Sequence, residues 1–491
     1  MNSWEQLSQH LEEQQTIIQL LELISWDQET YMPSKSIKQR SKQSGFLSGI
    51  LHQKKTDPDF ADLLMSLNPT TPLQKRAQEK AVTSLHRAQA VPTDLVQALS
   101  KTKALATQCW GKAKENNDLS AFLPALRDVI DRTREYASCF TAQDHIYDNL
   151  LEEYDPGMSV ARLDPMFHEL ETKLTPYVQA EISKKQPKEL DIFIPKDALT
   201  RVNHKVIYAL GFDQEAGRLD VSTHPFTVGM GPNDVRLTTR NLETDLLGTL
   251  SGTIHECGHG LYEQGLPLEH NHLGLCAAAG CGIHESQSRF YENIIGKSLA
   301  FFKWLSPIIY KESGLLIPAK RLYCAANRVS QSPVRVYADE TTYNLHIIVR
   351  YRLEKALIEQ SLSVEDLNDA WNEQYKKLLG FTPKTPKVGI LQDIHWSAGL
   401  FGYFPSYTLG NLFASSYRYA LEDSIPTLWE DIEKGDFGSV LNWLRENIHK
   451  KGHISSQENI VAQAVGSRNH VDDFLKHLQE RHNTRDELYS S

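Results

Sequence analysis

Apolar residues recur with helical spacing along most of the chain. The stretch 4–151 has this pattern almost throughout, and prolines such as Pro33 and Pro92 mark its breaks. Its first apolar face, which ends at Trp26, is formed by Ile17, Ile18, Leu20, Leu21, Leu23 and Ile24. Further helices are expected at 95–114, 121–140, 160–183, 287–304, 320–329, 340–360 and 367–379, and within 409–488. The pattern predicts a mainly α-helical protein.

Two short segments alternate between apolar and polar residues instead. They are 218–222 and 234–239, and turn-forming residues lie at 229–232 between them. We expect a small β-hairpin here, directly before a helix over about 242–264. Its position suits the edge of a cleft, where an extended peptide can add main-chain hydrogen bonds.

The domain organisation follows from what the chain lacks. A length of 491 residues would allow two to four domains, but the sequence contains no internal repeat and no low-complexity linker. We therefore predict one large helical body over residues 1–491, divided by a cleft, and not a string of modules.

Composition and charge exclude several classes of protein. Hydrophobic residues make up 40% and charged residues 23% of the chain, as in soluble globular proteins. The net charge of −10 argues against nucleic acid as a partner. The first residues have neither a basic nor an apolar signal region, and no run of about 18 apolar residues predicts a membrane span. We expect a cytoplasmic protein without a membrane partner.

A candidate metal site lies in the helix over 242–264. His255 and His259 flank Glu256 in an H-E-x-x-H sequence. At ~100° per residue the two histidines are about 400° apart, so both project from one face and can bind one metal ion. Glu256 lies beside them, close enough to accept a proton from water that the metal activates.

A third ligand is required, because catalytic zinc sites usually have three protein ligands and one open position. Glu285, on a second expected helix, is the natural choice. His284 competes with it, but neighbouring residues on a helix point about 100° apart, so we expect only one of the two to bind. The alternative for Glu285 is an exposed carboxylate without a ligand role.

Several motifs in order along most of the chain resemble one family. They are His224-Pro225-Phe226, the segment from Asp234 to Arg240, His255 to His259, His284 to Gln287, Val334 to Asp339, and Gly389 to Trp396. The segment from Trp26 to Pro33 is also similar. Together they resemble the thermostable metallocarboxypeptidases typified by carboxypeptidase Taq. Val334 departs from the isoleucine that the family usually has, which is a conservative change.

The resemblance implies several properties that spacing and composition do not. It implies one catalytic domain with a helical, saddle-like fold and a deep groove, similar to neurolysin and angiotensin-converting enzyme. It implies a zinc ion, or a cobalt ion, and the release of C-terminal residues from peptide substrates with broad specificity but poor action on proline. It also implies a homodimer.

Chemical roles can be assigned within this frame. Glu256 is expected to act as the general base. The oxyanion needs a further hydrogen-bond donor, and by similarity to neurolysin-like enzymes a tyrosine twelve positions after His395 supplies it. That residue is Tyr407. Tyr403 is the second choice, and His395 is expected to assist.

An exopeptidase also needs a cation for the terminal carboxylate of its substrate. Arg335 suits this role because a guanidinium can donate two parallel hydrogen bonds to a carboxylate. Its alternative is an ion pair with Asp339, four residues further on. Arg236 and Arg350 are weaker candidates, and His224 is expected to line the cleft.

Asp339 and Asp393 have another possible role, as acceptors that fix the tautomer of a histidine. Two other functions remain open at this stage. One is an endo-oligopeptidase that uses the same metal site. The other is a catalytically silent helical binding protein, which would have damaged ligands, whereas His255, Glu256, His259 and Glu285 are all present.

Overall fold

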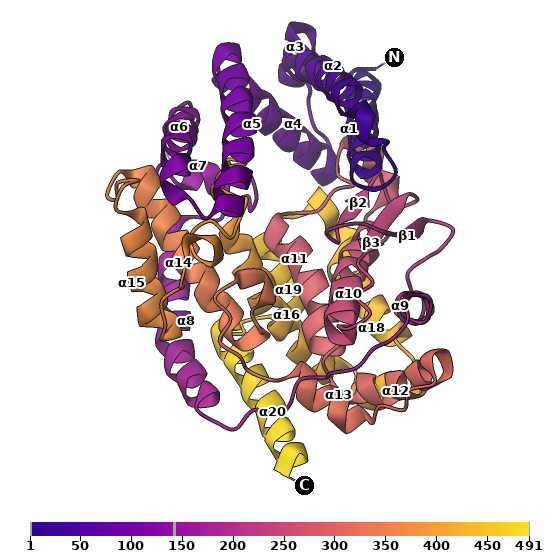
Figure 1. The fold of residues 1–491 in the computed structure, drawn as a ribbon. Helices are drawn as coiled ribbons and strands as arrows, with labels where there is room; N and C mark the ends of the chain where they lie inside the picture. The colour runs from indigo at the N-terminus through magenta and orange to yellow at the C-terminus, as the bar shows by residue number, and fades with distance from the viewer. Residues whose placement is uncertain (1, 141–143, 491) are drawn as a thin grey trace.

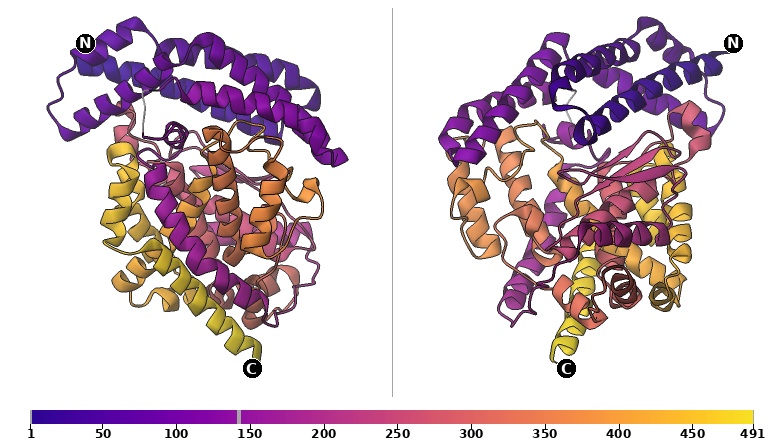
Figure 2. Two further views of the ribbon diagram at one scale, coloured as in Figure 1. Left: turned by 90° about the vertical axis from the view of Figure 1, so that its left-hand side faces the viewer. Right: turned by 45° about the vertical axis from the view of Figure 1, so that its right-hand side comes forward.

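The computed structural model describes residues 2–140 and 144–490. Helices form most of it, as the apolar pattern predicts (Figure 1). The amino-terminal helices lie as a layer across the rest of the molecule (Figure 2). They are α1 (Ser3–Thr30), α2 (Ile37–Lys55), α3 (Pro58–Ser66), α4 (Pro72–Ala90), α5 (Thr93–Asn116) and α6 (Leu119–Ala137).

The remaining helices build the body beneath this layer. They are α7 (Asp148–Leu151), α8 (Val160–Ile182), α9 (Lys196–Ala209), α10 (Leu246–Glu263), α11 (Cys281–Arg289), α12 (Leu299–Ser313), α13 (Ala319–Ala326), α14 (Glu340–Glu359), α15 (Leu367–Leu379), α16 (Phe404–Ser424), α17 (Leu428–Lys434), α18 (Gly438–Asn447), α19 (Gln457–Val465) and α20 (His470–Ser490). None of these described helices combines the length and the apolar character that a bilayer-crossing segment requires.

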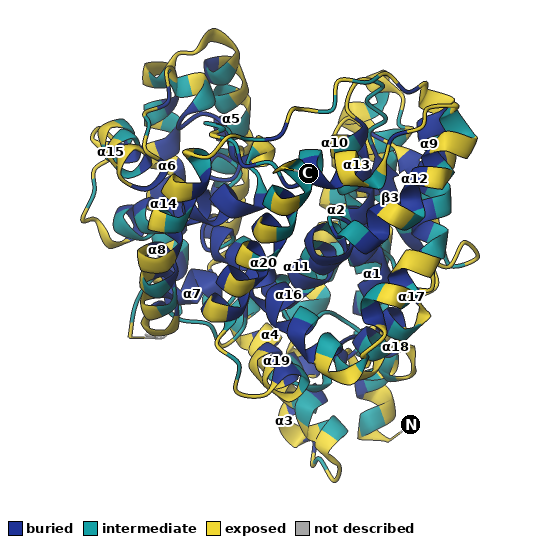
Figure 3. Ribbon diagram, turned by 90° about the horizontal axis from the view of Figure 1, so that it is seen from below, coloured by how far each residue is buried: buried dark blue, intermediate teal, exposed yellow. Residues whose placement is uncertain are grey.

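The main apolar core surrounds α16, which packs against α11, α14 and α20. Buried residues cover most of α16 and α11 in the centre of the molecule (Figure 3). A second, smaller core lies within the amino-terminal layer and includes Leu7, Phe60 and Leu85. Helices α1, α3 and α4 therefore share a core of their own, whereas α6 contributes Phe122 and Leu126 to the main core.

The small sheet has three strands, β1 (Gly217–Val221), β2 (Thr227–Gly229) and β3 (Val235–Thr239), in the order β1-β3-β2. The small sheet expected next to the motif-bearing helix is confirmed, but the expected hairpin of 218–222 with 234–239 is wrong, because β1 and β3 pair in parallel. Parallel strands cannot be joined by a tight turn. The connection between them instead contributes β2, which pairs antiparallel with the other edge of β3.

The helix that carries the metal motif packs directly beneath this sheet, where α10 contacts β2 and β3. Asp245 caps its first turn, with its side chain accepting a hydrogen bond from the Gly248 backbone at 2.8 Å. On its buried face, a Cβ added at Gly258 would lie 2.6 Å from the Gln287 carbonyl oxygen. Glycine therefore lets α10 and α11 approach closely, which brings the two motif-bearing helices together.

The helix expected at 287–304 differs in the structure. α11 ends at Arg289 and passes into a π-helical turn over Phe290–Ile295, and α12 starts only at Leu299. The Ser298 side chain accepts a hydrogen bond from the Phe301 backbone at 3.1 Å and so begins a new helix. The wider turn over Phe290–Ile295 contains Glu292, which faces the candidate metal site.

Candidate metal and catalytic site

The structure brings His255, His259 and Glu285 together, with one potential ligand atom from each lying within 4.8 Å of the others. The Nε2 atoms of His255 and His259 are 4.0 and 3.5 Å from Glu285 Oε2. Ligand atoms at about 2.0–2.1 Å from a tetrahedral ion lie ~3.3 Å apart, so this set needs only a small contraction to hold one. Two imidazole nitrogens and a carboxylate oxygen are also the donors that zinc accepts.

Glu285 is a buried carboxylate and not an exposed one, with 6% of its surface exposed. Arg289, one turn later on the chain, donates from Nε to Glu285 Oε1 at 2.7 Å, which leaves Oε2 for the histidine side. Although burial opposes the charged form, Arg289 and the two histidines lower the pKa of Glu285 to about 2. Glu285 is therefore held as an anion that can bind a cation.

Glu292 was not predicted from the sequence as a site residue. It contacts His255 directly and is linked to Glu285 through Arg289. Its Oε2 lies 2.9 Å from Nδ1 of His255 and accepts a hydrogen bond from Arg289 at 3.0 Å. Ser251 donates to its other oxygen at 2.7 Å. Because a carboxylate only accepts, His255 carries its proton on Nδ1 and presents a lone pair on Nε2. The sequence did offer a signal for Glu292, because Glu285, Arg289 and Glu292 are spaced at i, i+4 and i+7 and so share one face of a helix.

Glu256 projects from α10 beside this set and is buried. The Thr227 hydroxyl of β2 lies 2.7 Å from Glu256 Oε2 and 3.0 Å from the Glu256 backbone oxygen. Burial raises the pKa of Glu256, and the Thr227 hydroxyl opposes that shift. A raised pKa suits a carboxylate that must take up a proton and later release it.

The aromatic candidates gather where α16 begins. Tyr407 OH lies 3.2 Å from His395 Nε2, and the Tyr403 and Tyr407 rings meet edge to face at 5.2 Å between centroids. A Cβ added at Gly410, one turn after Tyr407, would lie 2.5 Å from Glu285 Cγ. The face of α16 that carries Tyr407 therefore lies directly against the third candidate ligand.

Arg335 is buried next to Tyr407, with its Cζ 5.0 Å from the ring centroid. Its ion-pair partner is Asp393 and not Asp339, because Nε and Nη2 donate to Asp393 Oδ1 at 3.0 and 2.8 Å. Nη1 donates to the Tyr343 hydroxyl at 2.7 Å. These bonds engage three of the five N–H donors of a guanidinium.

The aspartates considered as tautomer-fixing acceptors are engaged elsewhere. Asp339 caps α14, accepting hydrogen bonds from the Thr341 and Thr342 backbones at 2.9 and 3.2 Å. Asp393 joins Arg335 to the fully buried Arg350, whose Nε donates to its Oδ2 at 2.7 Å. Arg350 thus belongs to the same ionic network as Arg335.

The remaining substrate-binding candidates lie on the sheet side. Arg236 donates to both oxygens of Asp234 at 2.9 and 3.0 Å, and its Cζ lies 4.4 Å from the Trp26 ring centroid. His224 is exposed in the connection between β1 and β2. Within residues 2–140 and 144–490, no hydrogen bond or ion pair joins either side chain to His255, His259 or Glu285.

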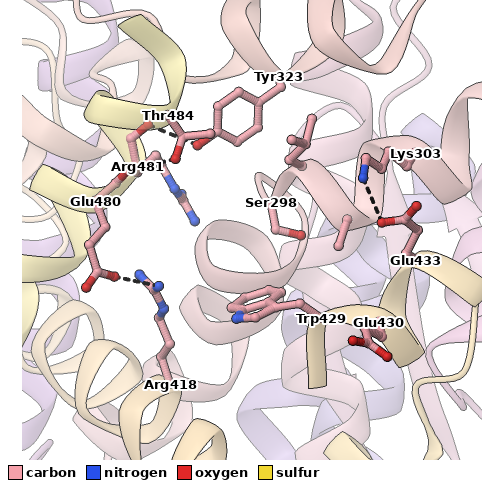
Figure 4. Close-up of a pocket in the computed structure, with 12 residues that line it drawn as sticks. Ser298, Lys303, Tyr323, Arg418, Trp429, Glu430, Glu433, Glu480, Arg481 and Thr484 are labelled. Carbon is pink, nitrogen blue, oxygen red and sulfur yellow. Dashed lines mark hydrogen bonds and ion pairs between the residues drawn. The ribbon is translucent and has the colours of Figure 1, made fainter. Parts of the chain in front are cut away.

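Two hollows lie in the described surface, and of these only the first is lined by a residue that contacts a candidate metal ligand. One of about 780 Å³ lies between the amino-terminal layer and the start of α11, and its lining includes Lys55, Lys80, Gly280 and His284. His284 contacts His259, so one side chain separates this hollow from a candidate ligand. Another, of about 320 Å³, is lined by charged groups that pair with one another, among them Lys303 with Glu433 (Figure 4).

Comparisons with known proteins agree with this geometry. Residues 6–482 match the family described as carboxypeptidase Taq (M32) metallopeptidase. Thermostable carboxypeptidase 1 of Thermus thermophilus is 37% identical over 480 residues, covering 94% of each chain, and carboxypeptidase 1 of Bacillus subtilis is 34% identical over 474 residues with the same coverage. The crystal structure of an M32 carboxypeptidase from Deinococcus radiodurans covers all of both chains at 32% identity with a TM-score of 0.94. The chain therefore belongs to the carboxypeptidase Taq (M32) family and is a metallocarboxypeptidase.

Proposed function

We propose that this enzyme releases single residues from the C-termini of peptides, with broad specificity but poor action on proline, at a divalent metal ion held by His255, His259 and Glu285. The observation that carries the proposal is the convergence of three ligand atoms within 4.8 Å on a buried, anionic Glu285. Zinc is the first choice and cobalt the second, since both suit imidazole and carboxylate donors. When bound, the ion supplies Lewis acidity that activates water and polarises the scissile carbonyl.

Glu256 acts as the general base in this proposal. Its carboxylate takes the proton of the attacking water and passes it to the leaving amine. The hydrogen bond from Thr227 fixes the orientation of the carboxylate. Burial helps the first half of the reaction, because it raises the pKa of Glu256 and so makes its carboxylate a stronger base toward the water.

Tyr407 donates a hydrogen bond from its hydroxyl to the oxyanion that forms on the carbonyl. Burial raises the pKa of Tyr407, so its hydroxyl stays protonated and remains a donor. Burial also lowers the pKa of His395 to about 3, so its ring is neutral and can fix the Tyr407 hydroxyl without competing for the oxyanion as a cation. Tyr403 packs against Tyr407 and is the second choice for the donor.

Arg335 binds the terminal carboxylate of the substrate. Three of its donors are engaged, which leaves two N–H groups for a carboxylate. Its contact with the ring of Tyr407, the proposed oxyanion donor, supports this role. Arg236 and His224 line the cleft further away, on the sheet side. A peptide that enters through the 780 Å³ hollow passes between the amino-terminal layer and α11.

The decisive experiment combines metal analysis with mass spectrometry of an unstructured peptide after digestion. One metal ion per chain and a ladder shortened only from the C-terminus are the expected results. Internal cleavage would favour the endo-oligopeptidase instead. A C-terminally amidated copy of the peptide is the matched control, since an exopeptidase should lose most of its activity on it and an endopeptidase little.

We also propose a cytoplasmic location and a homodimer, of which the homodimer rests on the family resemblance. Sedimentation velocity should give a mass about twice the 55.8 kDa of the chain. A single species at the monomer mass, at micromolar concentration, would contradict the dimer.

A further inference from the structure

His284 contributes to the site without belonging to the ligand set. Its Nδ1 lies 2.6 Å from Nδ1 of His259, and its Nε2 lies 2.8 Å from Oε1 of Glu263. His259 and Glu263 are four residues apart on α10, so they share one face, and His284 bridges them from α11. A hydrogen-bonded chain therefore runs from Glu263 through His284 to His259.

The carboxylate of Glu263 sets the direction of the hydrogen bonds that link Glu263, His284 and His259. A carboxylate only accepts, so His284 carries a proton on Nε2 and donates it to Glu263. In a neutral imidazole the other nitrogen is an acceptor, so Nδ1 of His284 accepts from Nδ1–H of His259. His259 is then left with a lone pair on Nε2, the atom that lies 3.5 Å from Glu285 Oε2.

We infer that His284 and Glu263 are positioning residues that hold His259 in the tautomer and orientation that bind the metal ion. The inference rests on the proposed ligand role of His259. His255 has the same arrangement in a shorter form, because its Nδ1 contacts the carboxylate of Glu292 directly at 2.9 Å. In both histidines a carboxylate determines which nitrogen faces the ion.

Packing holds the side chains of His259, His284 and Glu263 in place. The His259 and His284 rings lie 4.6 Å apart between centroids, and the Tyr262 ring meets His284 edge to face at 5.2 Å. A Cβ added at Gly229 of β2 would collide with Oε2 of Glu263, so glycine there lets the strand approach the carboxylate. The sheet therefore confines Glu263 on the side away from His284.

Two variants test the inference through metal affinity, which requires no substrate. Glu263→Gln gives His284 an amide partner that can donate, which allows the whole chain to reverse and place a proton on Nε2 of His259. His284→Phe removes the chain but keeps a ring. Zn²⁺ dissociation constants of the full-length apoprotein are measured by competition with a chromogenic chelator at neutral pH. Both variants should bind ~10–100-fold more weakly than the parent protein.

Matched controls separate positioning from general damage. His204→Phe changes another half-buried histidine, one that pairs with Tyr208 on α9, and Glu269→Gln changes an exposed carboxylate beyond α10. Both should bind Zn²⁺ within twofold of the parent. If His284→Phe fails to fold, His284→Asn replaces it. Its side-chain oxygen keeps an acceptor for His259, so affinity should fall less than in Glu263→Gln.

The outcomes are distinguishable. Zn²⁺ affinity within twofold of the parent in Glu263→Gln, together with unchanged affinity in the folded His284 variant, would overturn the positioning role and leave the proposed function intact. If the parent protein itself failed to bind Zn²⁺ stoichiometrically, the ligand assignment under the proposed function would fall instead. Weaker binding in both variants, with thermal unfolding of the apoproteins unchanged, supports the inference.

Discussion

Replacing Asp393 by asparagine should lower the stability of the folded protein, because this one carboxylate neutralises two buried guanidinium groups. Its Oδ1 accepts two hydrogen bonds from Arg335, and its Oδ2 lies 2.7 Å from Nε and 2.5 Å from Nη2 of Arg350. Although burial disfavours the charge, the two arginines hold the pKa of Asp393 far below its usual range. Asparagine keeps the shape but leaves both cations without a counter-charge.

The size of the effect follows from burial. Removing one partner of a buried ion pair costs about 3–5 kcal/mol. The entropy of unfolding is about 2.1 cal/mol/K per residue, so 491 residues correspond to about 1 kcal/mol/K. The melting temperature of Asp393→Asn should therefore fall by about 3–5 °C.

Differential scanning calorimetry of the metal-loaded proteins measures this shift. The matched control is Glu458→Gln, which breaks an exposed two-point pair with Arg162 and should lower the melting temperature by less than about 1 °C. Because the pKa of Asp393 is depressed by folding, its contribution is present above about pH 4 and is lost as the pH falls below that value. An Asp393→Asn protein that melts within 1 °C of the parent at neutral pH would refute the reasoning.

Three further predictions concern catalysis. Glu256→Gln should retain its metal content but lose ~10²–10⁴-fold in kcat, measured by release of the C-terminal residue, because the amide cannot accept the proton; full activity would contradict the role of Glu256. Thr227→Val removes a hydrogen bond that lowers the pKa of Glu256, so the acid limb of the kcat/KM profile should move to higher pH, and an unmoved limb would count against it. Tyr407→Phe should lower kcat by ~10²–10³-fold with little change in KM, as expected for one oxyanion donor; an unchanged kcat would direct attention to Tyr403.

Much of the helical architecture could be predicted because its signals are local. The helix expected at 367–379 is α15, Leu367–Leu379, which ends where Gly380 adopts a left-handed conformation. The pairing of the strands could not be predicted in this way. Whether 218–222 pairs with 234–239 in parallel or antiparallel depends on where the connecting chain packs, and β2 is only three residues long.

In the site, too, local features could be predicted from the sequence and contacts between distant segments could not. His255, Glu256 and His259 lie within one helical turn, so their common face follows from the sequence alone. Their hydrogen-bond partners come from other elements, as Thr227 does from β2, and no local pattern links such residues. The case of Arg335 is similar, because the sequence offered Asp339 four residues away, whereas folding supplies Asp393, 58 residues away.

The spacing between the ligands depends on two residues that are not ligands. Gly258 occupies a variable position of the H-E-x-x-H sequence, and a Cβ there would lie 2.6 Å from the backbone of α11. Gly410 on α16 faces Glu285 at a similarly short distance. Backbone atoms cannot move aside as a flexible side chain can, so a larger residue at 258 would separate α10 from α11. The distance between the two imidazoles and Glu285 is therefore set by helix packing, and glycine at 258 allows the close approach that the proposed metal site requires.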